Sequence, residues 1–263
     1  MITVLGAGGF IGSHIVKALE RSKQEYYAPA RNEDYMHRDL GDVIYCIGLT
    51  ADFRSRPFDT VSAHVCILND LLARGRFSSL LYLSSTRVYI HSQEKIVCEG
   101  DRISIDSVNS DDLYTLTKLT GESICLSSGR PCCIARLSNV IGAYQDKTVF
   151  ISQLVELIKK DGHIALEQSG TSGKDYIGVD EVVPLLLRLV KEKATGIYNI
   201  ASGMNTTNQQ LIDELSKYLT FTYTVNEKAQ PLVFPVISNE KIRKSFDFLP
   251  RAFSEQLPLI LEQ

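Results

Sequence analysis

A tyrosine and a lysine four residues apart, Tyr114 and Lys118, have the residue types and spacing to move a proton together. On a helix, residues i and i+4 project from one face, so the phenol and the ammonium would lie side by side. A free phenol has a pKa of about 10, too high for a base at neutral pH. A neighbouring positive charge stabilises the phenolate and lowers that pKa. Because such pairs are also common on helices that only face solvent, the pair needs support from other residues.

Hydroxyl side chains directly follow the apolar run Leu81–Leu83, at Ser84, Ser85 and Thr86. If this run is a strand, the hydroxyls lie at its carboxyl end. A serine there could hydrogen-bond a substrate oxygen while Tyr114 moves a proton. Taken singly, each hydroxyl could instead cap a turn. Together with the tyrosine and the lysine, they predict a proton-transfer site.

The chain begins with a short apolar run that leads into Gly6, Gly9 and Gly12. Bare backbone at the first two glycines would let a pyrophosphate approach the N–H groups at a helix N-terminus, where the dipole favours negative charge. The third glycine would let the helix pack closely on the strand. An ordinary strand-to-helix turn is the alternative. The N-terminal position and the strand–turn–helix context favour a dinucleotide site that includes Phe10 and Ile11.

Short apolar strands alternate with helical patterns along most of the chain. Strands are predicted at residues 1–5, 25–30, 43–48, 79–84, 132–137 and 196–201. Helices are predicted at residues 10–21, 59–74, 111–127, 149–160, 180–193 and 207–219, followed by short pieces near 239–246 and 253–262. Strands separated by helix-length segments pair in parallel. The predicted fold class is α/β: a Rossmann-like doubly wound parallel sheet with a small C-terminal substrate-binding lobe.

The alternating pattern loosens after about residue 145, which predicts two parts. We expect an NAD(P)-binding Rossmann domain over residues 1–165, to which residues 175–202 return. The small lobe would consist of residues 166–174 and 203–263. Such sheets bind ligands beyond the carboxyl ends of their strands, so a cleft between the two parts would hold the substrate.

Composition excludes several classes of function. The 263 residues carry a net charge of −3 with acids and bases interspersed, so there is no basic field for nucleic acid. No segment approaches the length of a membrane span, and the apolar start is too short for a signal peptide. We therefore expect a cytoplasmic protein that begins at Met1. The six cysteines and five histidines show no metal-ligand spacing, so no metal site is predicted.

With these residues assembled, the chain resembles the extended short-chain dehydrogenase/reductase family, the NAD-dependent epimerase/dehydratase group that acts mainly on nucleotide sugars. The glycine turn matches the family's G-x-x-G-x-x-G, and Tyr114 and Lys118 match its catalytic pair. Family members carry a catalytic Ser or Thr four residues before the Tyr of a "V-Y" pair, which selects Ser85. Further stretches that resemble family motifs are 42–48, 136–142, 174–182 and 196–200.

The resemblance implies roles for these residues. Ser85 would polarise the reacting oxygen, and Tyr114 would be the general acid/base. Lys118 would lower the pKa of the phenol and hold the nicotinamide ribose. Asn139 stands where the R-x-x-N-x-x-G motif has a substrate-contacting Asn, although it could equally be a turn residue.

The cofactor is predicted as NAD or NADP. Arg31 follows the second strand, where an NAD enzyme usually has an acidic residue on the ribose hydroxyls, and an arginine suits the 2′-phosphate of NADP. Arg31 therefore favours NADP slightly, although Glu33 and Asp34 lie close enough to reverse the preference. Asp39 and Leu40 resemble the family's Asp-apolar pair at the adenine, with a solvated loop acid as the alternative.

A departure from the family pattern bears on the reaction. Dehydratases of this family place an acidic pair directly after the catalytic residue, whereas this chain has Thr86 and Arg87. Elimination of water from the sugar is therefore disfavoured. Both residues are predicted to contact substrate, and Arg87 would meet a phosphate or a carboxylate. A plain surface arginine is the alternative.

These observations predict an NAD(P)-dependent enzyme that transfers hydride at a ring carbon of a nucleotide sugar, as an epimerase or as a ketoreductase. The alternative is a non-catalytic dinucleotide-binding redox sensor or scaffold, although relatives of that type usually lose the Tyr or the Lys. The resemblance also implies a homodimer formed through the helices at 59–74 and 111–127.

Overall fold

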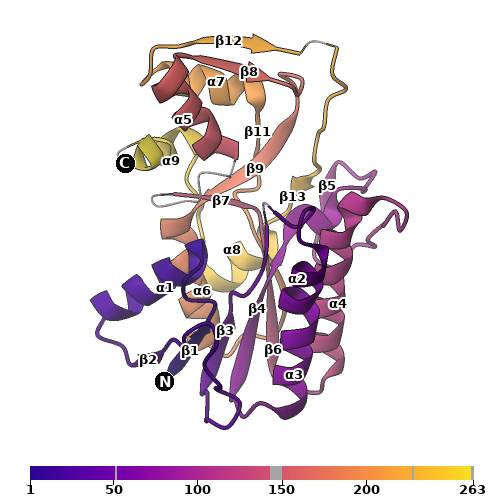
Figure 1. Cartoon of the computed structure of the whole chain (residues 1–263), viewed down its shortest axis with the longest axis vertical. Coiled ribbons are helices and arrows are strands. Elements are labelled where there is room, and N and C mark those ends of the chain that lie inside the picture. Colours follow the sequence, from indigo (N-terminus) through magenta and orange to yellow (C-terminus); the bar gives the residue numbers. More distant parts are fainter. Residues whose placement is uncertain (51, 143–149, 227, 262–263) are drawn as a thin grey trace.

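The computed structural model describes residues 1–50, 52–142, 150–226 and 228–261. At its centre lies a six-stranded sheet in the order β10-β6-β4-β3-β1-β2 (Figure 1). The strands are β1 (Ile2–Leu5), β2 (Tyr26–Tyr27), β3 (Asp42–Tyr45), β4 (Ser79–Ser85), β6 (Cys132–Leu137) and β10 (Gly196–Ile200). All neighbouring strands run parallel, so their carboxyl ends meet at one edge. The predicted α/β fold with a parallel sheet is confirmed.

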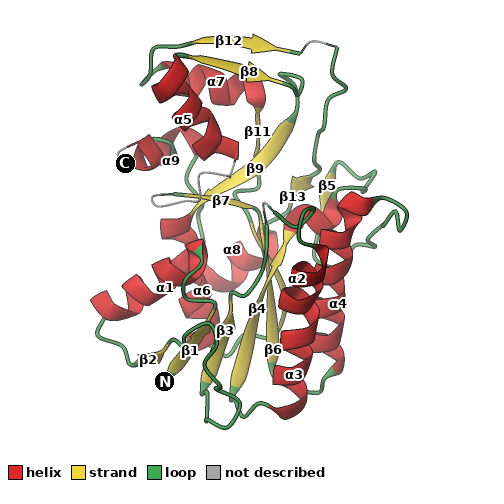
Figure 2. Cartoon of the chain, in the orientation of Figure 1, coloured by secondary structure: helices red, strands yellow, loops and turns green. Residues whose placement is uncertain are grey.

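Helices cover both faces of this sheet, as Figure 2 shows. One face carries α1 (Phe10–Arg21) and α6 (Val179–Lys191). The other face carries α2 (Pro57–Val61), α3 (Ile67–Arg74) and α4 (Leu113–Ser127). Because both faces are covered, the strands are buried on both sides, which is why they read as continuous apolar runs in the sequence.

Each face of the sheet has its own cluster of buried apolar side chains. Alternate residues of each strand enter different clusters, since successive side chains of a strand point to opposite faces. On β3, Ile44 packs with the α1 and α6 side, whereas Tyr45 packs with α3 and α4. On β6, Ala135 and Ile134 divide in the same way.

Two connections differ from the predicted elements. The strand predicted at 25–30 is reduced to Tyr26–Tyr27, and residues 28–41 join it to β3 without a helix. The helix predicted at 59–74 is interrupted by a π-helical turn, Ser62–Cys66, between α2 and α3. A π turn widens a helix by one residue and changes which side chains face a neighbour. Here the wider turn buries His64 completely.

The C-terminal part adds small sheets and short helices above the carboxyl edge of the main sheet (Figure 1). β7 (Asn139–Ile141), β9 (Gly173–Gly178) and β11 (Asn205–Thr207) form a three-stranded sheet. β8 (His163–Leu166) pairs with β12 (Thr222–Val225), and β5 (Ile96–Val97) pairs with β13 (Val236–Ile237). The helices of this region are α5 (Phe150–Asp161), α7 (Asn208–Ser216), α9 (Phe253–Gln256) and α10 (Pro258–Leu261).

A separate apolar cluster holds the C-terminal part together. It gathers side chains from α5, β8, α7 and α9, among them Ile151, Ile164 and Leu211. By contrast, α8 (Glu240–Phe246) packs on the main sheet through Ile242 and Phe246. The residue limits of the two predicted domains stay a prediction.

The described ranges contain neither a membrane-spanning helix nor a cluster of metal-binding side chains. They contain no helix that is both long enough and apolar enough to cross a membrane. Within the same ranges, no three or more His, Cys, Asp or Glu side chains gather in a way that could hold a metal ion.

Candidate functional site

The glycine turn after β1 is closely packed against backbone. Gly6 has φ +85°, and a Cβ there would lie 2.8 Å from the carbonyl carbon of Cys46. A Cβ at Gly12 would lie 2.3 Å from the carbonyl oxygen of Gly6. Neither position can accept a side chain without moving backbone. The first turn of α1 therefore packs directly on the end of β1.

The N-terminus of α1 is open to an anion. In the part of the chain that the structure describes, no side chain caps Gly9, and the first turn, which begins Phe10-Ile11-Gly12, carries no acidic residue. Unpaired N–H groups and the helix dipole at such an end attract negative charge. Such a helix end can hold a phosphate group, and the dinucleotide site at the glycine turn stays a prediction.

The remaining residues predicted at the cofactor lie at opposite ends of the sheet. Arg31 is exposed and follows the carboxyl end of β2, on the same edge as the glycine turn. Asp39 and Leu40 instead precede β3, at the amino edge. The Asp39 carboxylate accepts a hydrogen bond from the backbone N–H of Gly41, and Leu40 is buried in the core. The structure does not bring these two residues to the glycine turn.

Ser85 and Tyr114 meet at the carboxyl edge. Ser84 and Ser85 point to opposite sides of β4, and the Ser84 hydroxyl donates to Glu122 at 2.5 Å. The Ser85 hydroxyl lies near enough to the buried phenol of Tyr114 to act on its pKa. Burial raises the pKa of Tyr114, and the Ser85 hydroxyl and the positive charge of Arg87 oppose that rise.

Lys118 extends along α4 toward the same edge. Its Nζ donates to the carbonyl oxygen of Leu83 at 2.9 Å and lies 5.9 Å from the centre of the Tyr114 ring. Burial lowers the pKa of this lysine to about 8, and the carboxylate of Glu122 opposes the shift. The lysine therefore remains largely charged at neutral pH.

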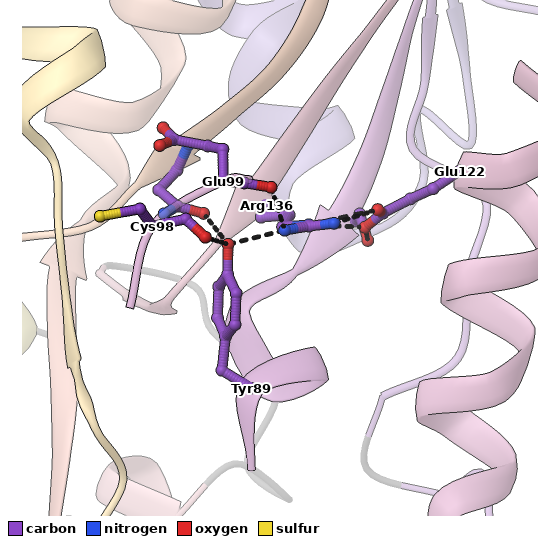
Figure 3. A network of polar contacts seen from close by, with 7 residues as sticks. Tyr89, Cys98, Glu99, Glu122 and Arg136 are labelled. Carbon is purple, nitrogen blue, oxygen red and sulfur yellow. Dashed lines mark hydrogen bonds and ion pairs between the residues drawn. The ribbon is translucent and has the colours of Figure 1, made fainter. Parts of the chain in front are cut away.

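A buried polar network joins α4 to β4 and β6 (Figure 3). Glu122 and Arg136 form a bidentate ion pair, with the shortest contact 2.6 Å, and both side chains are buried. Arg136 also donates to the Tyr89 hydroxyl at 2.6 Å. Ser84 and Arg136 are register partners on neighbouring strands, which explains why both reach Glu122. The network fixes the helix that carries Tyr114 relative to β4 and β6.

Glu122 is not among the predicted site residues, although the sequence carries a signal for it. Glu122 follows Lys118 by four residues and Tyr114 by eight, so all three project from one face of α4. Its charge acts on Lys118, which makes it part of the electrostatics of the site.

His64 is a second residue that the sequence analysis missed. Its Nε2 accepts a hydrogen bond from the N–H of Leu49 at 3.2 Å, so Nδ1 carries the proton and donates to Thr117 at 2.8 Å. Thr117 in turn donates to the carbonyl oxygen of Tyr114. Burial and the charge of Lys118 lower the pKa of His64 to about 2, so the ring stays neutral. No sequence spacing links His64 to this helix, since the contact depends on the π turn.

The predicted substrate residues are spread around the same edge. Thr86 is buried, and Arg87 is half-buried one residue further on. Asn139 lies on β7 with its side chain exposed, and its Nδ2 donates to the carbonyl oxygen of Asp175 at 2.8 Å. That amide therefore already links β7 to β9.

Comparison with known protein families decides the class of the chain. The model of the NAD dependent epimerase/dehydratase family matches residues 2–201. The chain belongs to this family. Its members are enzymes of the type that the glycine turn and the Ser85, Tyr114 and Lys118 arrangement predict, so the expected family and enzyme class are confirmed.

Individual relatives are distant. Protein CapI of Staphylococcus aureus is 23% identical over 238 residues, which cover 74% of this chain and 70% of that protein. The UDP-glucuronic acid 4-epimerase of Bacillus cereus, solved with UDP-glucuronic acid and NAD, superposes with a TM-score of 0.84 at 19% identity, covering 99% and 98% of the two chains. RMD of Pseudomonas aeruginosa, complexed with NADPH, gives a TM-score of 0.80 at 21% identity, covering 99% and 97%. At these identities the two structures establish the fold.

Proposed function

We propose that this member of the epimerase/dehydratase family binds a nucleotide sugar and transfers hydride at one of its ring carbons. The observation that carries the proposal is the meeting of Ser85, Tyr114 and Lys118 at the carboxyl edge, beside a glycine turn that fits a pyrophosphate. The solved B. cereus relative contains UDP-glucuronic acid and NAD, which supports a nucleotide sugar as the substrate class.

Each side chain has a distinct task in this mechanism. Ser85 hydrogen-bonds the reacting sugar oxygen and holds it at Tyr114. Tyr114 takes the proton of the sugar hydroxyl as the ring carbon is oxidised, and returns a proton when the ketone is reduced. Lys118 stabilises the phenolate by its charge. When bound, the nicotinamide accepts or supplies the hydride at the ring carbon.

Two net reactions are compatible with this mechanism, and they differ in whether the cofactor is recycled or consumed. If the ketone is reduced again on its opposite face, the net reaction is epimerisation and the cofactor is recycled. If a keto sugar is the substrate, the net reaction is reduction and the cofactor is consumed. Thr86 and Arg87 offer no carboxylate for dehydration, which supports these two outcomes over elimination.

The cofactor preference is proposed from Arg31. Its exposed guanidinium follows the carboxyl end of β2, where the 2′-phosphate of NADP would be reached. Glu33, the nearby acid, accepts hydrogen bonds from the Tyr27 hydroxyl at 2.6 Å and the Ala30 N–H at 3.1 Å. Because Glu33 is already engaged, we expect tighter binding of NADP than of NAD.

The experiment is a substrate panel with the purified full chain. Nucleotide sugars and 4-keto nucleotide sugars are incubated with NAD, NADP or their reduced forms, and products are separated by chromatography. Isomerised sugar without cofactor consumption indicates an epimerase, and consumption of reduced cofactor indicates a reductase. Binding of a dinucleotide without conversion of any sugar would instead support the sensor or scaffold alternative.

We further propose that the protein is a cytoplasmic homodimer. Apolar side chains remain exposed on the helices that the family resemblance assigns to the interface, Phe58 on α2 and Leu126 on α4. Light scattering of the purified protein measures the assembly directly. A Phe58→Glu and Leu126→Glu double variant should become monomeric, and a wild-type monomer would contradict the proposal.

A further inference from the structure

Arg87 lies beside the groups that act on the reacting sugar oxygen. Its backbone N–H donates to the Ser85 hydroxyl at 3.2 Å. Its guanidinium carbon lies 5.8 Å from the centre of the Phe53 ring, and that ring lies 5.4 Å from the ring of Tyr114. An anion bound by this guanidinium would therefore belong to the same sugar on which Ser85 and Tyr114 act.

The guanidinium makes no hydrogen bond in the part of the chain that the structure describes. Its Nε is buried and makes no hydrogen bond, and Arg87 forms no ion pair there. Arg54 provides the contrast, because it lies over the same Phe53 ring at 4.6 Å and makes two bonds to Asp111 at 2.5 and 2.7 Å. A buried N–H group without an acceptor costs free energy, and the Nε–H of Arg87 is such a group.

The nearby acidic side chains are already engaged. Asp111 is held by Arg54, and Asp112 accepts from His91 at 2.6 Å and from the backbone N–H of Asp106 at 2.9 Å. Both carboxylates act on the charge of Arg87 from a distance, but neither forms an ion pair with it in the described ranges. The acceptor that the guanidinium lacks would then come from a ligand.

Lys174 on β9 is a second positive charge that acts on Arg87. It is half-buried, its Nζ lies 5.3 Å from the centre of the Phe150 ring, and within the described ranges it forms no ion pair. Burial lowers the pKa of Lys174, and the charge of Arg87 adds to that effect, so the two cations act on each other. Two partly desolvated like charges repel, and an anion bound by Arg87 would reduce that repulsion and supply the missing acceptor.

We propose that Arg87, assisted by Lys174, binds a carboxylate carried by the sugar ring, so that the preferred substrates are nucleotide derivatives of uronic acids. A guanidinium matches a carboxylate because its N–H groups form parallel hydrogen bonds to both oxygens. The inference rests on the proposed nucleotide-sugar function and adds the charge of the sugar to it.

A matched pair of substrates tests the inference with the cofactor-loaded full chain. UDP-glucuronate and UDP-glucose share the nucleotide and the diphosphate and differ only in the carboxylate; if the panel selects another nucleotide, the pair takes that nucleotide. We expect kcat/KM to be higher for the uronate. Arg87→Leu should lower the uronate-to-hexose ratio of kcat/KM by about 10-fold or more, the loss of a charge-assisted bond.

Further variants keep the test decisive. Lys174→Met should lower the same ratio by a smaller factor, and Arg87→Lys should retain part of it. Arg87→Gln replaces Arg87→Leu if the latter does not fold. Lys217→Met is the control, because it removes an exposed lysine of the C-terminal part that is already paired with Glu214, and it should leave the ratio unchanged.

Two results would overturn the inference while the proposed function stands. One is a wild-type preference for the neutral hexose. The other is an equal loss for both substrates in Arg87→Leu, because the arginine would then serve the diphosphate or the fold. If no nucleotide sugar is converted although the cofactor binds, the proposed function itself fails.

Discussion

The two halves of the site are built by opposite means. The glycine turn depends on the absence of side chains, with Gly6 and Gly12 packed against backbone within one seven-residue stretch. The half on β4 and α4 depends on buried polar side chains, such as Lys118 and the Glu122–Arg136 pair, that come from distant parts of the chain. Bare backbone suffices to hold a phosphate group, whereas proton transfer requires charged groups whose partners fix both position and pKa.

Tyr114→Phe should have the largest effect, because it should lower turnover and leave cofactor binding at the glycine turn unchanged. Removing the phenolic oxygen eliminates proton transfer, so turnover should fall about 10²- to 10⁴-fold. Cofactor affinity should not change, because the glycine turn is intact. Steady-state kinetics and cofactor titration measure the two effects, and Tyr218→Phe, an exposed tyrosine, is the control. Unchanged turnover in the Tyr114 variant would remove the phenol from the mechanism.

The second prediction concerns the stability that the buried Glu122–Arg136 pair gives to the half of the site on β4 and α4. Glu122→Gln leaves the buried Arg136 without its anion and should lower the free energy of unfolding by about 3–5 kcal/mol. Urea denaturation measures this change. The control is Glu240→Gln, which breaks only an exposed pair with Lys244 and should have no measurable effect. Equal effects of the two substitutions would show that the buried network does not fix α4.

The glycine half has its own test. Gly12→Ala places a methyl group 2.3 Å from the Gly6 carbonyl oxygen, and the resulting shift should cost about 1–3 kcal/mol and weaken dinucleotide binding. Gly100→Ala is the matched control, because a Cβ there meets no atom within 4 Å. Cofactor titration of the folded variants provides the comparison. Wild-type affinity in Gly12→Ala would place the dinucleotide elsewhere.

A further prediction concerns the charge of Lys118. Its pKa of about 8 lies below the ordinary value of 10.5, so the unfolded chain binds more protons than the folded one between these pH values. The cost of burying the charged lysine is present below pH 8 and disappears as the pH rises toward 10.5.

Stability and turnover should therefore respond to this lysine in opposite directions. The contribution of Lys118 to stability rises with pH across that window, whereas turnover falls as the charge is lost. Urea denaturation at several pH values, compared with Lys118→Met, isolates this contribution. Identical pH profiles in the two proteins would contradict the shifted pKa.

The sequence predicted the parts of the fold in which local pattern and burial agree. All six strands of the main sheet were placed, and the inner strands β1, β3, β4 and β6 most closely, because each of these is an apolar run that is buried almost throughout. Short strands such as Val236–Ile237 were missed, since two residues carry no periodicity and their pairing is set by distant partners. The contact of His64 with Thr117 also joins distant parts of the chain, so no local pattern predicts it.

Resemblance to a motif was less reliable than structural context. Ser85, Tyr114 and Lys118 come together because β4 and α4 deliver them to one edge. Asp39 and Leu40 resemble a cofactor motif but lie at the opposite edge, because they directly precede β3. A motif is informative only when the strand that precedes it ends at the right side of the sheet.

The central claim is that hydrogen moves directly between the cofactor and a ring carbon of the sugar. The most direct measurement is the reaction in D₂O, with a nucleotide sugar that the enzyme converts, followed by mass and NMR analysis of the product. Hydride transfer predicts no deuterium on the reacting ring carbon, because the phenol of Tyr114 exchanges only the hydroxyl proton. Deuterium on that carbon would contradict the account.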